Sequence, residues 1–309
     1  MNWSGVMPAI TTPFDSKLAV DHAFLAQHAT WLLHNGCTGL VMLGSLGEGA
    51  TLEHAEKIAI LKTAVRVSAK KKTPVVASIS ALSTSHAVEL AREAEQAGCD
   101  GLMVLPPYVY TSDWREMKQH VATVIAATKL PCMLYNNPVS YTTDFLPAQI
   151  KDLAAEHENL EAVKESSADV RRVAAIREVL GDRLTIFVGV DDVLVEGVNA
   201  GAVGWVAGLV NAYPAASVEL FNLARAGRHD EAFELYRWFL PLLRLDTVPK
   251  FVQLIKWVQE QAGVGSARVR APRLELQGSE LAEVKAVFEK AKATRKPIDE
   301  RPISEFAGA

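Results

Sequence analysis

The sequence predicts an α/β protein, a TIM (β/α)8 barrel with a C-terminal helical extension. Eight short apolar runs alternate with amphipathic stretches over the first 226 residues, a rhythm typical of strand and helix units around a parallel sheet. The alternation stops after residue 226, where three helical patterns follow one another. We therefore expect a (β/α)8 catalytic barrel at 1–226, and a three-helix extension with an irregular tail at 227–309.

The expected strands are runs of a few apolar residues, whereas the expected helices have amphipathic periodicity. The strands are predicted at 5–10, 38–43, 74–80, 101–105, 131–136, 160–165, 184–189 and 203–208. The barrel helices are predicted at 21–35, 53–69, 84–97, 113–127, 147–155, 169–180, 191–200 and 211–226, and those of the extension at 229–243, 248–262 and 278–293. Most barrel helices open with Asp, Thr or Asn, which are good N-caps, and several close near a glycine.

Composition excludes several classes of protein. The 309 residues are 49% apolar and 22% charged, with a formal net charge of −4, so no basic face for nucleic acid is expected. The chain has no uncharged apolar run of membrane-spanning length, so no membrane partner is expected. Three scattered cysteines, Cys37, Cys99 and Cys132, fit a reducing compartment. These features predict a soluble, cytoplasmic protein.

Lys164 is the first candidate catalytic residue. It follows "LEAV" in the sixth predicted strand, and catalytic groups of such barrels lie at the C-terminal ends of the strands. Burial disfavours the ammonium and would leave a neutral amine able to attack a carbonyl or imine carbon. A lysine that snorkels from a strand end is the alternative, and position alone leaves it open.

Two further motifs follow neighbouring strands. Tyr135 ends the fifth strand beside Lys164, where a phenol could relay protons, or could simply cap the core. The loop "GSLGEG" at 44–49 follows the second strand and offers backbone N–H groups and the Ser45 hydroxyl to a carboxylate. As a generic glycine-rich loop it is weak evidence.

Other polar residues favour no metal site. The eight histidines fall mainly in helical patterns without metal-ligand spacing, so surfaces and helix caps are expected for them. Asp191 and Asp192 could form a carboxylate pair for acid or base work, or an N-cap with a first-turn acid. The Trp and Phe of "YRWF" are expected to pack between helices.

Three motifs in order, "GSLGE" at 44–48, "YNNP" at 135–138 and "VKESS" at 163–167, resemble those of the dihydrodipicolinate synthase and N-acetylneuraminate lyase family of Schiff-base barrels. The resemblance covers nearly the whole chain, including "GVMPAITTPF" near the start and "GVDD" after the seventh strand. It implies a class I aldolase-type lyase, usually a homotetramer, that acts on a small carboxylate-bearing substrate without a metal or organic cofactor.

The resemblance also implies residue roles. Lys164 would form the imine, Tyr135 would relay protons, and Ser45 would join that relay and bind the substrate carboxylate with the Leu46 N–H. The further substrate-binding residues expected from the resemblance are Asn137, Ser140, Tyr141 and Val206. Tyr110 is expected as a relay or pocket residue, because the tyrosine that a neighbouring subunit supplies in the synthase aligns with Val109, next to it.

The departures from the synthase pattern concern its second substrate. The synthase arginine that binds the distal carboxylate of the semialdehyde corresponds to Ser140, and the second threonine of its "GTTGE" corresponds to Leu46. A serine cannot replace the bidentate contact of a guanidinium.

The chain is similar to the 1-pyrroline-4-hydroxy-2-carboxylate deaminases of this family in "MNWSG", "YNNP", "DDV-x-VE" and "LYRWF-x-PLL-x-LD". The prediction is therefore that deaminase, which in hydroxyproline degradation yields 2,5-dioxopentanoate and ammonia. The alternatives are a 4-hydroxy-tetrahydrodipicolinate synthase, a 2-keto-3-deoxy-sugar-acid aldolase or dehydratase, and a non-enzymatic 2-oxo-acid sensor. Retention of both Lys164 and Tyr135 argues against the sensor.

Overall fold

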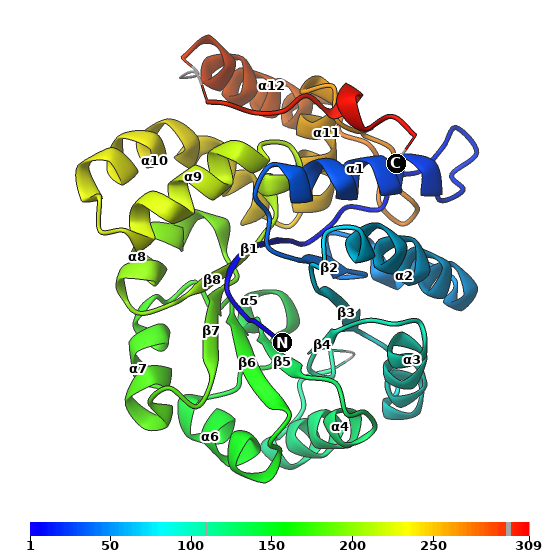
Figure 1. Cartoon of the computed structure of the whole chain (residues 1–309), viewed down its shortest axis with the longest axis vertical. Coiled ribbons are helices and arrows are strands. Elements are labelled where there is room, and N and C mark those ends of the chain that lie inside the picture. Colours follow the sequence, from blue (N-terminus) through cyan, green and yellow to red (C-terminus); the bar gives the residue numbers. More distant parts are fainter. Residues whose placement is uncertain (109, 295–297, 309) are drawn as a thin grey trace.

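The computed structural model describes residues 1–108, 110–294 and 298–308, and it confirms the predicted barrel. The eight strands are β1 (Gly5–Pro8), β2 (Leu40–Met42), β3 (Val75–Ile79), β4 (Gly101–Val104), β5 (Cys132–Asn136), β6 (Leu160–Glu165), β7 (Thr185–Val188) and β8 (Gly204–Ala207). All their pairings are parallel, in the order β1-β8-β7-β6-β5-β4-β3-β2. A parallel bridge between Ala9 and Val41 brings the two edges together, so that the strands form a ring (Figure 1).

Helices alternate with the strands and form the outer layer (Figure 1). They are α1 (His22–His34), α2 (His54–Ala69), α3 (Thr84–Gln96), α4 (Trp114–Ala126), α5 (Pro138–Tyr141), α6 (Pro147–Glu156), α7 (Arg171–Leu180), α8 (Leu194–Asn199) and α9 (Pro214–Arg225), with 3₁₀ turns η1 (Gly49–Thr51), η2 (Asp191–Val193) and η3 (Leu209–Asn211). Two predicted helices thus begin three residues late, after η2 and η3. The reason is that Asp191 and Asn211 turn their side chains inward, and Asn211 donates to the Ala9 carbonyl oxygen at 2.8 Å.

The barrel interior beside β6 is filled by a row of aligned residues. Register pairs Tyr135 with Lys164, Lys164 with Phe187, and Phe187 with Gly204, and paired residues of parallel strands share a face. A Cβ atom at Gly204 would lie 2.2 Å from the Phe187 ring, so only glycine leaves space for that ring. Trp3 packs edge-on against Phe187 at 6.2 Å between ring centroids. Lys164 therefore stands in an apolar, closely packed interior.

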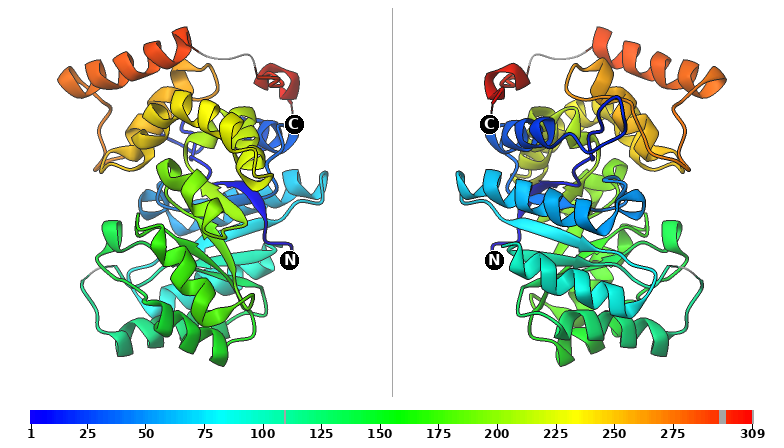
Figure 2. Two further views of the ribbon diagram at one scale, coloured as in Figure 1. Left: turned by 90° about the vertical axis from the view of Figure 1, so that its left-hand side faces the viewer. Right: turned by 90° about the vertical axis from the view of Figure 1, so that its right-hand side faces the viewer.

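The predicted three helices of the extension are present as α10 (His229–Leu243), α11 (Phe251–Gln261) and α12 (Gly278–Ala293), with turns η4 (Arg244–Asp246) and η5 (Ile303–Phe306). They stack at one edge of the barrel, where α10 packs against α9 and α12, and η5 against α1 (Figures 1 and 2). Trp238 and Phe239 of α10 stack at 5.2 Å, as expected of packing residues. The described part of the chain contains no helix with the length and hydropathy of a membrane span.

A buried ion pair ties the extension to the loop that follows β2. Lys256 on α11 donates to Glu48 at 2.8 Å and to the Thr12 carbonyl oxygen at 2.9 Å. Glu48 also accepts from the Arg270 backbone N–H at 3.0 Å, and neither side chain of the pair is more than 2% exposed. Arg273 lies 3.9 Å from Glu48, but Lys256 is the nearest counter-charge, so removing either partner of the buried pair would leave the other without its main charge partner.

We predict that Lys256→Met lowers the free energy of unfolding by about 3 kcal/mol, because it leaves the Glu48 carboxylate buried without its ammonium partner. The double variant Glu48→Gln/Lys256→Met should recover much of this loss, since neither charge remains. Lys250→Ala, which breaks the exposed Lys250–Glu280 pair, is the control and should cost less than about 1 kcal/mol. Denaturant unfolding measures all three, and equal losses in the single and double variants would contradict the prediction.

Candidate active site

The C-terminal ends of β5 and β6 bring Tyr135 and Lys164 together. The two residues are paired in register, and the Lys164 amine lies 4.3 Å from the centre of the Tyr135 ring. Both side chains are buried, with relative exposures of 5% and 6%. The alternative of a snorkelling Lys164 is therefore wrong for this structure, because the amine stays inside the barrel.

Burial decides the charge state of the Lys164 amine. Loss of water lowers its pKa to about 8, although the nearby carboxylates of Asp246 and Asp191 favour the ammonium. The lowered pKa means that desolvation outweighs both carboxylates. The face of the Tyr135 ring, 4.3 Å from the amine, is a further contact that suits the ammonium. At neutral pH about a tenth of such an amine is neutral.

Gly189 provides the space that the Lys164 side chain occupies. A Cβ atom there would lie 2.7 Å from both Cγ and Cε of Lys164, and 1.9 Å from the Ser166 hydroxyl oxygen. That hydroxyl is buried, and it lies near enough to the Tyr135 phenol to lower its pKa, against the stronger effect of burial. Lys164 and Ser166 thus depend on a missing side chain at the end of β7.

Tyr135 keeps its proton and can donate it. Asn137 donates from Nδ2 to the phenol oxygen at 2.9 Å, which leaves the phenol proton free for another acceptor. Burial raises the pKa of Tyr135 to about 12, so the phenol is neutral over the physiological range. A neutral phenol beside an amine is suited to proton transfer in both directions.

Ser45 was expected to join the relay of Tyr135, and in the structure its hydroxyl bonds to Tyr141. The two hydroxyls of Ser45 and Tyr141 are hydrogen-bonded, and the Tyr141 ring packs edge-on against Tyr135 at 5.9 Å. Tyr141 ends the short helix α5, which Asn137 caps by accepting from the Ser140 N–H at 3.0 Å. Tyr141 therefore lies between the β2 loop and Tyr135, although the sequence suggested only a binding role for it.

The loop at 44–49 keeps two backbone donors open. Within the described residues, no group accepts from the N–H of Ser45 or of Leu46. The loop itself is rigid, because Gly47 lies so close to the Ile10 carbonyl oxygen that a Cβ atom would be 2.7 Å away. Such adjacent free N–H groups suit a carboxylate.

Asp191 is a buried structural acceptor and not a helix cap. Its carboxylate accepts from Trp205 Nε1 at 2.9 Å, from the Gly208 N–H at 3.1 Å and from the Leu209 N–H at 2.8 Å. Burial raises its pKa to about 6. Asp192 points elsewhere, with Arg244 Nε at 3.7 Å, so the two do not work as a pair. Asp191 instead orients the segment that follows β8.

Asp246 was not predicted for the site. It comes from η4 in the extension, and its carboxylate lies against Gly208, where a Cβ atom would be only 2.1 Å from Oδ1. Burial, with the charge of Asp191, raises its pKa well above the ordinary value, and its charge acts on both Lys164 and Tyr135. The segment "RLD" is a helix end in sequence, and nothing local to it indicates a position in the barrel mouth.

The remaining expected residues are placed as follows. Ser140 is exposed on α5. Val206 is buried in β8, two residues beyond Gly204 and so on the same strand face. Tyr110 is 55% exposed and lines a separate groove with residues of α3 and α4. Val109 lies outside the described residues.

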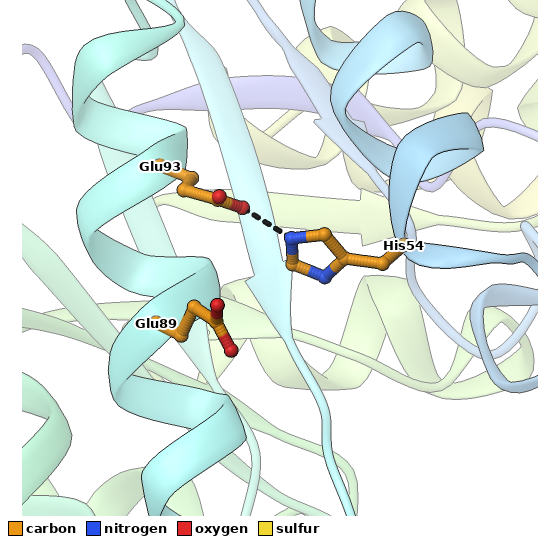
Figure 3. A group of neighbouring side chains, drawn as sticks. All are labelled: His54, Glu89 and Glu93. Atoms are coloured by element: carbon orange, nitrogen blue, oxygen red, sulfur yellow. Dashed lines mark hydrogen bonds and ion pairs between the residues drawn. The ribbon is translucent and has the colours of Figure 1, made fainter.

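The histidines are not all at surfaces and caps as expected. His28 and His120 are buried, and His28 bonds to the Asn211 carbonyl oxygen at 2.9 Å. In the described chain one cluster has metal-ligand types in reach of each other: His54, Glu89 and Glu93, on the outer helices α2 and α3 (Figure 3). His54 already contacts Glu93, and the two side chains are about half and one third exposed. This cluster is separate from Lys164, and the expected absence of a metal remains a prediction.

We predict that Gly189→Ala displaces the Lys164 and Ser166 side chains and lowers the free energy of unfolding by about 1–3 kcal/mol. Ser166→Ala/Gly189→Ala removes the closest overlap and should regain part of that loss. Gly181→Ala is the control for backbone strain without overlap, because a Cβ atom there meets nothing within 4 Å while φ is positive, and it should cost about 1 kcal/mol. Thermal and denaturant unfolding measure the free energy of unfolding of each variant. The prediction is wrong if Gly189→Ala loses no more of this free energy than Gly181→Ala does.

Comparison with known proteins agrees with this geometry. Residues 2–291 match the model of the dihydrodipicolinate synthetase family. The 4-hydroxy-tetrahydrodipicolinate synthases of Bartonella bacilliformis and Desulforamulus reducens are 33% and 29% identical to this chain, over 88% and 93% of it and 92% and 97% of their own lengths.

Solved structures are similar over the whole barrel. The 4-hydroxy-tetrahydrodipicolinate synthase of Methylacidiphilum fumariolicum SolV superposes with a TM-score of 0.90 at 27% identity, over 94% of this chain and 97% of that one. YagE, a prophage protein of the family from E. coli K12 solved in complex with pyruvate, gives 0.87 at 26% identity, over 94% and 99%. With a family match over nearly its whole length and a relative that is one third identical, the chain belongs to the dihydrodipicolinate synthetase family, whose members are Schiff-base, class I aldolase-type lyases.

Proposed function

We propose that Lys164 is the Schiff-base nucleophile and Tyr135 its proton relay. The observation that carries this proposal is a buried lysine amine of lowered pKa over the ring of a neutral, protonated phenol. A small fraction of neutral amine suffices for attack on a carbonyl or imine carbon, and the phenol can return the proton that each later step requires.

The substrate carboxylate is proposed to bind at the loop after β2. The open N–H groups of Ser45 and Leu46 and the Ser45 hydroxyl support this role, because a carboxylate offers acceptors to all three. Asn137 orients the Tyr135 phenol, and Tyr141 connects Ser45 to it. Ser140 and Val206 are kept as proposed pocket residues.

The proposed reaction is the deamination of 1-pyrroline-4-hydroxy-2-carboxylate. The Lys164 amine adds to C2, the C2–N bond of the ring breaks, and the ring nitrogen leaves as a primary amine on C5. The new imine acidifies C3, a proton leaves C3, and the C4 hydroxyl departs as water after protonation, for which Tyr135 is placed. A proton then moves from C5 to C3, which leaves an enamine at C4 and C5. A second proton moves from the enamine nitrogen to C4, so that C5 becomes an imine. Water hydrolyses this imine to an aldehyde and ammonia, and a second water releases 2,5-dioxopentanoate from Lys164.

A 4-hydroxy-tetrahydrodipicolinate synthase is the second candidate, and the names of the relatives favour it. Against it stands Ser140, exposed on α5 where the synthase pattern has an arginine for the distal carboxylate of the second substrate. An aldolase or dehydratase for 2-keto-3-deoxy sugar acids shares the same imine chemistry and is the third. The family membership disfavours a 2-oxo-acid sensor.

A homotetramer in the cytoplasm remains part of the proposal. The exposed Tyr110 is compatible with a role toward a neighbouring subunit, because it does not point at Lys164 of its own chain.

We predict that Schiff-base formation depends on pH through Lys164. Its pKa is lowered to about 8, so the neutral amine increases as pH rises and is nearly complete by about pH 9. The rate of borohydride trapping with pyruvate should rise roughly tenfold per pH unit from 6 toward 7.5 and level above about 8. Mass spectrometry of the peptide that contains Lys164 measures the fraction trapped at each pH, and Lys164→Arg is the control that should not be trapped. A midpoint near 10.5, the ordinary lysine value, would contradict the prediction.

The assay that decides the function compares two substrates with one protein. We expect turnover of freshly made 1-pyrroline-4-hydroxy-2-carboxylate to 2,5-dioxopentanoate, followed with its dehydrogenase, and little turnover of pyruvate with aspartate semialdehyde. Lys164→Ala should lose at least ~10³-fold in kcat and Tyr135→Phe about 10²-fold or more, whereas the exposed control Lys250→Ala stays at the parent value. Turnover of the second mixture alone would establish the synthase instead.

A further inference from the structure

Asp246 is the one charged residue from the C-terminal extension that the mechanism above does not use, although its charge acts on both Lys164 and Tyr135. Its position is set by backbone contact. The carboxylate oxygens would lie 2.1 and 2.9 Å from a Cβ atom on Gly208, so the absence of a side chain there admits the carboxylate to the end of β8.

The two carboxylates near Lys164 differ in what they can still bind. Asp191 is saturated by the Trp205 ring N–H and the N–H groups of Gly208 and Leu209. Asp246 accepts no hydrogen bond from any residue that the structure describes, and it remains partly exposed. It therefore keeps its acceptor capacity for a molecule in the barrel mouth, whereas Asp191 holds the strand end in place.

The electrostatics at this side of the mouth disfavour a second carboxylate. Burial already raises the pKa of Asp246, so a distal carboxylate and Asp246 could not both be ionised there without a large cost, whereas a nearby positive charge would favour the ionised Asp246. A positive charge, Arg273, acts on Tyr141, but its guanidinium lies 3.9 Å from Glu48. An amine, iminium or hydroxyl would instead donate to the Asp246 carboxylate.

We propose that Asp246 binds the distal end of the substrate and selects 2-oxo-acid derivatives whose distal part carries a nitrogen or hydroxyl donor in place of a carboxylate. The inference rests on the proposed Schiff-base function of Lys164 and deepens it. With the carboxylate anchored at Ser45 and Leu46, the substrate extends from the β2 loop across Lys164 toward Gly208 and Asp246. The amine released by ring opening, or the hydroxyl that departs, is the donor that Asp246 accepts from.

The test measures recognition without requiring turnover. Three probes are trapped on Lys164 with borohydride: pyruvate, which has no distal group, 2-oxoglutarate, which has a distal carboxylate, and 1-pyrroline-2-carboxylate, which has a distal nitrogen and no hydroxyl to eliminate. Trapping efficiency for each of the last two is divided by that for pyruvate. The parent protein should favour the pyrroline over 2-oxoglutarate by at least tenfold.

Asp246→Asn should lower the pyrroline ratio and raise the 2-oxoglutarate ratio, each by about tenfold. Pyruvate trapping should itself rise, because the Asp246 charge no longer favours the Lys164 ammonium, and the ratios remove this common change. A gain with 2-oxoglutarate is not expected from simple structural damage. Asp246→Glu should keep the parent's order of preference. Asp192→Asn, which removes a neighbouring acid that bonds to Arg244 instead, is the matched control and should change neither ratio. Asp246→Ser, smaller and neutral, is used if Asp246→Asn does not fold.

Unchanged ratios in a folded neutral variant would overturn the inference, even if 1-pyrroline-4-hydroxy-2-carboxylate is turned over. If the trapping ratios shift but 1-pyrroline-4-hydroxy-2-carboxylate is not turned over, the proposed deamination is wrong and the proposed role of Asp246 still holds. Absence of trapping by all three probes in the parent would refute both.

Discussion

The candidate site depends on one constraint, which is that the Lys164 amine is buried inside a closed barrel. Parallel strands fix its neighbour Tyr135 in register, and the missing side chain of Gly189 gives it room. Burial in this interior opposes the ammonium more strongly than the two nearby carboxylates support it. The same apolar packing that stabilises the barrel thus produces an amine that can be neutral near physiological pH.

The extension after the barrel takes part in the site and does not merely cover one edge. Lys256 holds Glu48, and with it the loop that carries Ser45, while η4 brings Asp246 to the end of β8. Lys256 and Glu48 are 208 positions apart in the sequence, and Asp246 reaches Gly208 from the extension. The extension therefore acts on both ends of the proposed substrate position. Lys256 holds the loop that is proposed to bind the substrate carboxylate, and Asp246 is proposed to contact the distal end of the substrate.

Family membership and substrate are separate questions in this barrel. The lysine, the tyrosine and the loop after β2 serve every reaction that passes through an imine of a 2-oxo acid, so they establish the chemistry but not the second half of the substrate. We propose that side chains from α5 and η4 contact that half. Ser140 is neutral where the synthase pattern has an arginine, and this missing charge is a physical reason to doubt a dicarboxylate product.

The barrel, its eight strands and the placement of Lys164 and Tyr135 at the ends of neighbouring strands could be predicted from the sequence, because apolar runs, strand ends and motif order are local signals. The sequence also indicated Ser45 and the loop at 44–49. It missed Asp246, the inward turn of Asp191 and the bond from Ser45 to Tyr141, and it expected His28 and His120 at surfaces. Only the tertiary structure decided these, since each depends on contacts between distant segments, such as the space left by Gly208 and the acceptor on Asn211, that no local pattern encodes.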